Sequence, residues 1–239
     1  MSYPQDKGQT DKVHNTGEII YGGDGTNFYP IRVLTDGYLD TRPRETIQAE
    51  LLACQSVAAS THVTSSVLSV AGVKKTAIFI DHGRASTAAF GTQGTEYRIE
   101  GSAQSSGNDT WRPLASVVAA SAACLAVAAS ADVAASGTTV VVTSGTSIPS
   151  RGNIVFWANT VSAASSEWMK VLSVSGTASF VIEDGLTRGQ DSDTNIFTQA
   201  EQFVLLFDVE PITRLRVRVN NNASGTTLAV YSRVGCITA

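Results

Sequence analysis

Few side chains in this sequence have the types and spacing that catalysis requires. Its three histidines stand at positions 14, 62 and 82, and none has a second histidine three or four residues away. His82 follows Asp81 and could act as an oriented base, but no Ser or Cys nucleophile motif accompanies it and GxSxG is absent. We therefore expect His82 to be a surface turn residue and the chain not to be an enzyme.

The candidates for metal and cofactor binding are equally incomplete. Asp191 and Asp193 have the spacing to share a cation, but a calcium loop also needs a glycine bend and a distal bidentate Glu, which are missing here. The run Gly22-Gly23-Asp24-Gly25 matches neither GxGxxG nor the P-loop, and a β-rich stretch follows it where a phosphate site needs a helix. We expect no metal and no cofactor. Three cysteines without a CxxC pair are expected to be small buried hydrophobes: Cys54, Cys124 and Cys236.

A row of arginines is the one patterned set of charges. Arg214, Arg216 and Arg218 alternate with Leu215, Val217 and Val219. In a strand this period of two places the arginines on one face and the apolar side chains on the other. The face could be solvated, with pairing to Glu201, Asp208 or Glu210. Alternatively, it could be a basic stripe that meets an acidic partner surface.

Composition excludes several classes of protein. Of the 239 residues only 16% are charged, against about 25% in ordinary soluble proteins, and 43% are hydrophobic with many Ala and Val. A net charge of −4 argues against nucleic acid, since phosphate binding depends on Lys and Arg. The uncharged run 114–131 is mostly Ala and Ser, which contribute little insertion energy, so we expect no membrane span. The N-terminus has no apolar core and predicts no signal peptide.

The first 46 residues predict an extended arm. Residues 18–21 and 28–33 are β-rich, and the glycines between them are typical of a turn. Pro30 and Pro43 cannot donate ladder hydrogen bonds, so these strands should lie at an edge or against a partner. The arm has too few apolar groups to form a domain alone.

The remainder predicts an all-β protein, because short β-rich runs alternate with Gly, Asn and Ser turns. We expect an antiparallel β-sandwich from residues 47–126 and 198–239, interrupted by an inserted small β-barrel-like domain at 127–197. Two consecutive domains that divide near residue 136 are the alternative. The expected strands are 49–57, 64–70, 74–81, 95–101, 111–118, 138–143, 153–157, 167–174, 178–183, 202–208, 213–220 and 227–234.

Several motifs resemble those of tailed-bacteriophage virion structural proteins. The stretch 22–39, GGDGTNFYPIRVLTDGYL, is similar to the "DGTNW-P-RVD-DG-L" opening of many such proteins. EPITRLRVRV at 210–219, with Tyr231-Ser232, resembles the last strands of their β-sandwich domains, and WRPLAS at 111–116 resembles a strand in the middle. EWMKVLSVSG at 167–176 and LTRGQDSDT at 186–194 resemble small β-barrel modules on capsid-associated proteins.

The resemblance implies a non-enzymatic virion protein, made in the host cytoplasm, that binds the outer capsid surface as a decoration (cement) protein or head fibre. Its partners would be the major capsid protein and other copies of itself, and the expected homo-oligomer is a trimer. A tail or baseplate component is one alternative. Another is a carbohydrate-binding adhesin with aromatic platforms at Tyr97, Trp111, Trp157 and Trp168. The expected partner-binding residues are Tyr21, Asp24, Phe28, Tyr29, Pro30, Arg32, Arg214, Arg216 and Arg218.

Overall fold

The computed structural model divides the chain into two units, Met1–Glu45 and Thr46–Ala239. Each unit is described by itself. The described residues are 20–23, 28–33, 39–40, 48–84, 86–90, 94–107, 110–143, 149–159, 162–176, 178–192, 194–198, 200–223 and 230–238.

The first unit contains a small antiparallel sheet in the order β1-β2-β3, formed by Ile20–Gly23, Phe28–Val33 and Leu39–Asp40. Gly22 and Gly23, which we expected in a turn, pair with Tyr29 and Phe28 and so belong to strand β1. Pro30 pairs with Tyr21 on the β1 side. On its other side β2 pairs with β3 through Arg32 and Val33.

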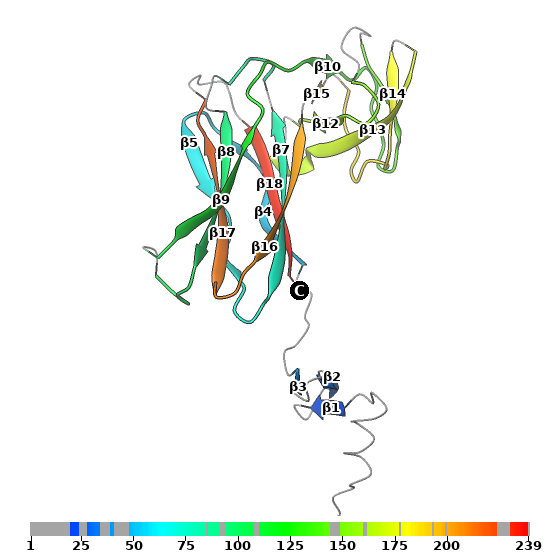
Figure 1. The fold of residues 1–239 in the computed structure, drawn as a ribbon. Coiled ribbons are helices and arrows are strands. Elements are labelled where there is room, and N and C mark those ends of the chain that lie inside the picture. The colour runs from blue at the N-terminus through cyan, green and yellow to red at the C-terminus, as the bar shows by residue number, and fades with distance from the viewer. Residues whose placement is uncertain are drawn as a thin grey trace, which may run out of the picture. The chain divides into compact units, whose positions relative to one another are not determined.

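Two antiparallel sheets form a sandwich in the second unit (Figure 1). The first sheet has the order β16-β7-β18-β4, and its strands are Glu201–Asp208, Lys75–Arg84, Val230–Thr238 and Gln48–Val57. The second has the order β5-β17-β8-β9, with strands Thr61–Thr64, Arg214–Asn221, Thr95–Ser102 and Arg112–Ala119. The short strand β6, Leu68–Ser69, also pairs with β17. Every second side chain of the central strands enters a shared core that includes Ile78, Ile80, Ile99 and Val217.

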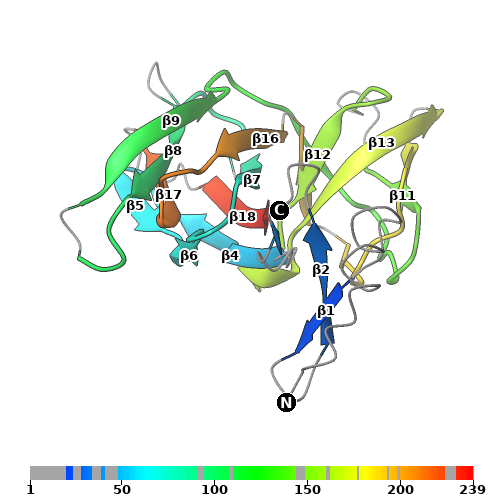
Figure 2. The same ribbon diagram turned by 60° about the horizontal axis from the view of Figure 1, so that its bottom comes forward.

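A third sheet, which we call the insert sheet, comes from residues 126–197, between β9 and β16 in the chain (Figure 2). Its order is β10-β15-β12-β13-β14-β11, with bounds Ala126–Ala128, Asn195–Phe197, Ile154–Trp157, Glu167–Ser175, Ser179–Ile182 and Thr139–Val141. A 3-10 turn, η2, spans Ala163–Ser165. The insert sheet has its own core, which includes Val140, Val155, Trp157, Phe180 and Ile196.

Aromatic side chains join the insert sheet to the sandwich. The Phe156 ring lies 4.8 Å from the Trp168 ring and 5.1 Å from the Tyr231 ring of β18. Phe156 also covers Gly83 of β7 so closely that a Cβ atom there would lie 2.5 Å from the ring. The insert therefore packs on the outer face of the first sheet at a site that only glycine can provide.

The predicted all-β class is confirmed, and the described residues contain no α-helix. Observed strands cover the expected positions with shifts of a few residues, with one exception. The expected 64–70 strand contains only Thr64, the last residue of β5, and the two-residue β6, while residues 227–229 of the last expected strand lie outside the described ones. The three-residue strands β10 and β15 were not expected. The run 114–131 forms parts of β9 and β10, and no helix of the described chain is long and apolar enough to cross a membrane. The three cysteines are buried and free, as expected.

Candidate functional site

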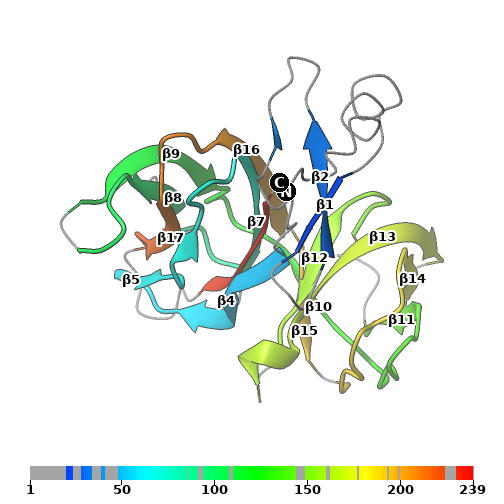
Figure 3. The ribbon, with the colours of Figure 1, turned by 90° about the horizontal axis from the view of Figure 1, so that it is seen from below.

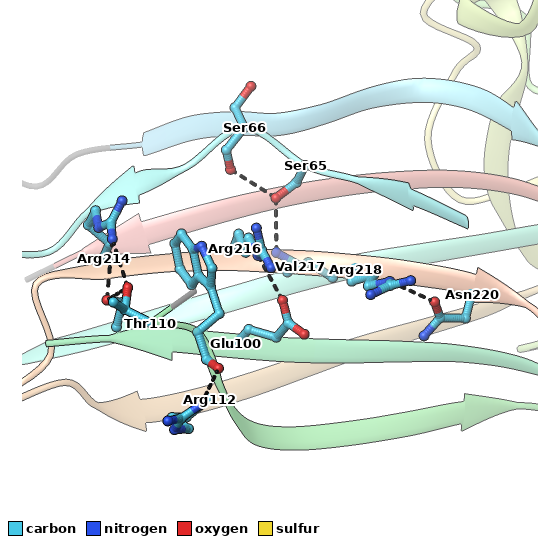
Figure 4. Close-up of polar contacts among 12 residues, drawn as sticks. Ser65, Ser66, Glu100, Thr110, Arg112, Arg214, Arg216, Val217, Arg218 and Asn220 are labelled. Atoms are coloured by element: carbon cyan, nitrogen blue, oxygen red, sulfur yellow. Dashed lines mark hydrogen bonds and ion pairs between the residues drawn. The ribbon is translucent and has the colours of Figure 1, made fainter. Parts of the chain in front are cut away.

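The predicted arginine row lies on β17, on the outer face of the second sandwich sheet (Figure 4). Leu215, Val217 and Val219 are wholly buried in the core, and the alternate residues, including the arginines, are partly exposed. This division follows directly from the period of two along the strand. We call the outer face formed by the arginines and their partners on β8 the arginine face.

Arg214 holds the loop between β8 and β9. Its Nε donates to the Gln104 carbonyl at 2.6 Å, and its Nη2 donates to the carbonyls of Ser106 and Gly107 at 2.9 and 3.0 Å. The same guanidinium lies 4.8 Å from the centre of the Trp111 ring. Several donors in a fixed plane can satisfy several carbonyls at once, so this arginine orders the loop beside it.

Arg216 forms an ion pair with Glu100, its direct cross-strand neighbour on β8, with Nε and Oε2 2.7 Å apart. Both side chains are largely buried, at 21% and 10% exposure. Arg216 also lies 4.2 Å from the centre of the Trp111 ring, so the indole contacts two guanidinium groups. The sequence suggested Glu201, Asp208 or Glu210 as partners. Instead, the carboxylate comes from β8, because strand register decides which residues face one another.

A second polar group continues the arginine face toward the other end of β17. Arg218 donates from Nε to Asn220 Oδ1 at 3.1 Å, and Asn220 donates to Glu96 at 3.1 Å. Glu96 is also paired with Arg98 at 3.0 Å. The arginine face thus presents Arg98, Arg214, Arg216 and Arg218 against only two carboxylates. It is locally cationic in an anionic chain, and the hydrogen bonds hold its charges in place.

The other predicted partner residues lie in the first unit. Tyr21 is in β1, while Phe28, Tyr29, Pro30 and Arg32 are in β2. The β1–β2 ladder places Tyr21 directly opposite Pro30. Asp24 lies outside the described residues. The arm residues and the arginine row belong to different units.

His82 is not the surface turn residue that we expected. It lies in β7, is wholly buried and shares a hydrogen bond of 2.8 Å between Nδ1 and the Tyr97 hydroxyl. Tyr97 in turn shares a hydrogen bond of 2.8 Å with Ser232. Burial, and secondarily the positive charge of Arg84, lower the pKa of His82 from 6.5 to about 3, so the ring is neutral at pH 7. The following glycine suggested a turn, yet the alternation of Ile78, Ile80 and His82 could have predicted a core position.

Arg84, two residues further along β7, was also missed. Its side chain is buried, donates to the carbonyls of Ala88 and Ala122, and lies 4.1 Å from the centre of the Phe90 ring. Burial lowers the pKa of Arg84 from its ordinary value. It links the β7–β8 loop at Ala88 to the segment between β9 and β10 at Ala122, which is a structural task.

Two of the four proposed sugar-stacking aromatics are core residues. Tyr97 and Trp157 are wholly buried, whereas Trp111 and Trp168 are partly exposed. Trp168 is covered by the Arg233 guanidinium at 5.1 Å from its ring centre. Among the described residues no three His, Cys, Asp or Glu side chains form a metal site, and Asp193 lies outside them.

Comparison with known proteins assigns no family to the chain. No family model matches it, and no curated protein matches it. Among solved structures it is similar to "Structure of infectious bursal disease virus Gt strain", with 8% sequence identity and a TM-score of 0.21. The alignment covers 93% of this chain and 45% of the viral chain. This chain therefore spans less than half the length of the viral chain. At this TM-score the likeness defines neither a shared fold nor a function.

Proposed function

We propose that this chain is a non-enzymatic structural component of a tailed-bacteriophage virion, which binds the outer capsid surface as a decoration or head-fibre protein. The observation that carries the proposal is the incomplete sheet of residues 20–40. It has three strands, and the third pairs with only the last two residues of β2. In the described part of this unit, the backbone of Phe28–Ile31 has no strand partner on the β3 side.

Such a small sheet gains stability when another strand completes it. Isolated hairpins are marginal in water, and an open edge can accept a strand from another protein. The motif resemblance of residues 22–39 to virion proteins names the kind of protein that would supply this strand, a major capsid protein. The β-sandwich and the insert would then project from the shell. Symmetric copies would sum weak contacts into a stable coat.

Deletion of the arm tests this role. Shells assembled without this chain would be mixed with the full chain, with a variant lacking residues 2–17, and with a variant lacking residues 2–46, and then sedimented. The full chain and the shorter deletion, which keeps β1–β3, should sediment with the shells. The longer deletion should stay in the supernatant, with circular dichroism confirming that its β-sheet content is retained. Equal binding by the longer deletion would overturn the role of the arm.

The position of the protein on the particle distinguishes the capsid from the tail. Cryo-electron microscopy of virions should show density for the sandwich on the outer shell. Density confined to the tail or baseplate would replace the decoration role with the tail alternative.

A further inference from the structure

Most sheet edges of the sandwich carry features that prevent pairing with another chain. Strand β9 contains Pro113 and a register shift against β8 at Glu100. Strand β4 has two register shifts against β18, near Val234. Strand β5 is only four residues long. Proline, bulges and short length are the usual protections of an exposed edge.

Strand β16 has none of these features. It pairs with β7 in one unbroken register, from Glu201 opposite His82 to Asp208 opposite Lys75. Its interior, FVLLF at 203–207, is entirely apolar, and no proline, lysine or arginine occurs in the strand. Two of its side chains on the outer face are largely exposed, Val204 at 59% and Leu206 at 81%. In the part of the chain that is described, no strand pairs with its other side (Figure 3).

The sequence of this edge is complementary to itself. When two copies pair antiparallel about a two-fold axis through Leu205, perpendicular to the sheet, each residue meets one from the same face. Val204 then lies opposite Leu206 of the second copy, and Phe203 lies opposite Phe207. At the ends, the Gln202 amide meets the Asp208 carboxylate, so no like charges are opposed. Each of these pairs matches apolar with apolar or donor with acceptor.

We propose that β16 is a dimerisation edge, at which two copies of the chain join their four-stranded sheets into one continuous sheet. Backbone hydrogen bonds would supply the pairing, and Val204 and Leu206 would be covered by each other across the axis. The symmetry of this contact is two-fold, so it gives a dimer, and a trimer would need another surface. The inference goes beyond the proposed virion role and does not depend on it.

The oligomeric state of charge variants tests the proposal. A single pair of strands is a small interface, so association should be weak and is best measured by light scattering or sedimentation at about 100 μM protein. The unmodified chain should be a dimer. The double variant V204K/L206K places Lys opposite Lys twice and should be a monomer with unchanged circular dichroism. The double variant V204K/L206E places Lys opposite Glu twice and should dimerise again. The control L172K/V174K, which adds the same charge at two exposed apolar side chains of the insert sheet, should remain a dimer.

Cross-linking tests the register. A mixture of the single variants V204C and L206C should form disulfide-linked dimers under mild oxidation, because these positions oppose each other across the axis. Each variant alone should cross-link far less. A monomeric or trimeric unmodified chain, a V204K/L206K variant that still dimerises, or a V204K/L206E variant that does not, would each overturn the proposal. The proposal would also be overturned if the mixture of V204C and L206C cross-linked no more than either variant alone. These outcomes leave the capsid-binding test of the arm unaffected.

Discussion

The Nδ1 atom of His82 lies 2.8 Å from the hydroxyl of Tyr97, and both side chains are wholly buried between the sandwich sheets. The other ring nitrogen, Nε2, is buried without a hydrogen-bond partner. Burial, and secondarily the positive charge of Arg84 on the same strand, disfavour the protonated form of the ring. The folded protein therefore holds this histidine neutral.

The stability of the protein should fall on acidification because of His82. Its pKa is lowered to about 3 in the folded state, so the unfolded chain takes up a proton first, as the pH falls below 6.5. The contribution is fully present above pH 6.5 and is lost as the pH approaches 3. The slope is about 1.4 kcal/mol per pH unit, which amounts to about 2 kcal/mol by pH 5. Urea unfolding of the native protein between pH 4.5 and about 8 measures it.

A matched pair of substitutions isolates this histidine. The difference in unfolding free energy between the native protein and H82N should shrink as the pH falls, because Asn does not titrate in this range. Replacement of the exposed Leu172, which carries no titratable group, by Asn should give a difference that hardly changes with pH. Parallel pH profiles for the native protein and H82N would show that the pKa of His82 is the same in the folded and unfolded states, which would contradict the prediction.

Alternation along strands made much of this fold predictable. From the residues alone it located the core face of β17 and the outward direction of Arg214, Arg216 and Arg218. The same alternation along β7 indicates a core position for His82, but the adjacent Gly83 suggested a turn. That glycine is needed because Phe156, more than seventy residues later, occupies the space of a side chain. A contact between residues so distant in sequence leaves no local pattern.

Cross-strand partners were the part that could not be predicted. Glu100 became the partner of Arg216 through the β8–β17 register, which depends on loop lengths and on a bulge near Glu100. Strands β10 and β15 are three residues long, too short to show a period. For the arm, strand positions were close to those observed, and its partner contacts remain a prediction.

Addition of one methyl group at Gly83 should loosen the joint between the insert and the sandwich. The new Cβ would lie 2.5 Å from the Phe156 ring, so G83A should destabilise the protein by about 1–3 kcal/mol. G235A is the control on the neighbouring strand, since its nearest atom is the Ala49 carbonyl oxygen at 3.6 Å. Thermal unfolding and near-ultraviolet circular dichroism measure both. Partial recovery in G83A/F156L would locate the strain at the ring, and equal stability of G83A and G235A would contradict the packing.

Removal of Arg216 should leave Glu100 as a largely buried carboxylate without its ion-pair partner. R216M should therefore lower the unfolding free energy by about 1–3 kcal/mol. The double variant E100Q/R216M should lose less than the sum of the two single variants, because the pair is removed together. R218M is the comparison and should cost much less, since among the described residues Arg218 donates to an amide oxygen two residues away and not to a carboxylate. Additive losses at positions 100 and 216 would argue against the pair.

Replacement of Arg214 by lysine should release the loop between β8 and β9 without unfolding the sheet. Arg214 bonds the carbonyls of Gln104, Ser106 and Gly107 at once, and a lysine ammonium cannot reach all three in the same geometry. Hydrogen exchange in R214K should rise at residues 103–107 and stay unchanged in β17. R112K changes an exposed arginine of β9 and keeps the hydrogen bonds of Arg214 to the loop. It should leave hydrogen exchange in the loop unchanged. Unchanged loop protection in R214K would mean that the loop is ordered by its other contacts, such as the Ser102–Thr110 hydrogen bond of 2.7 Å.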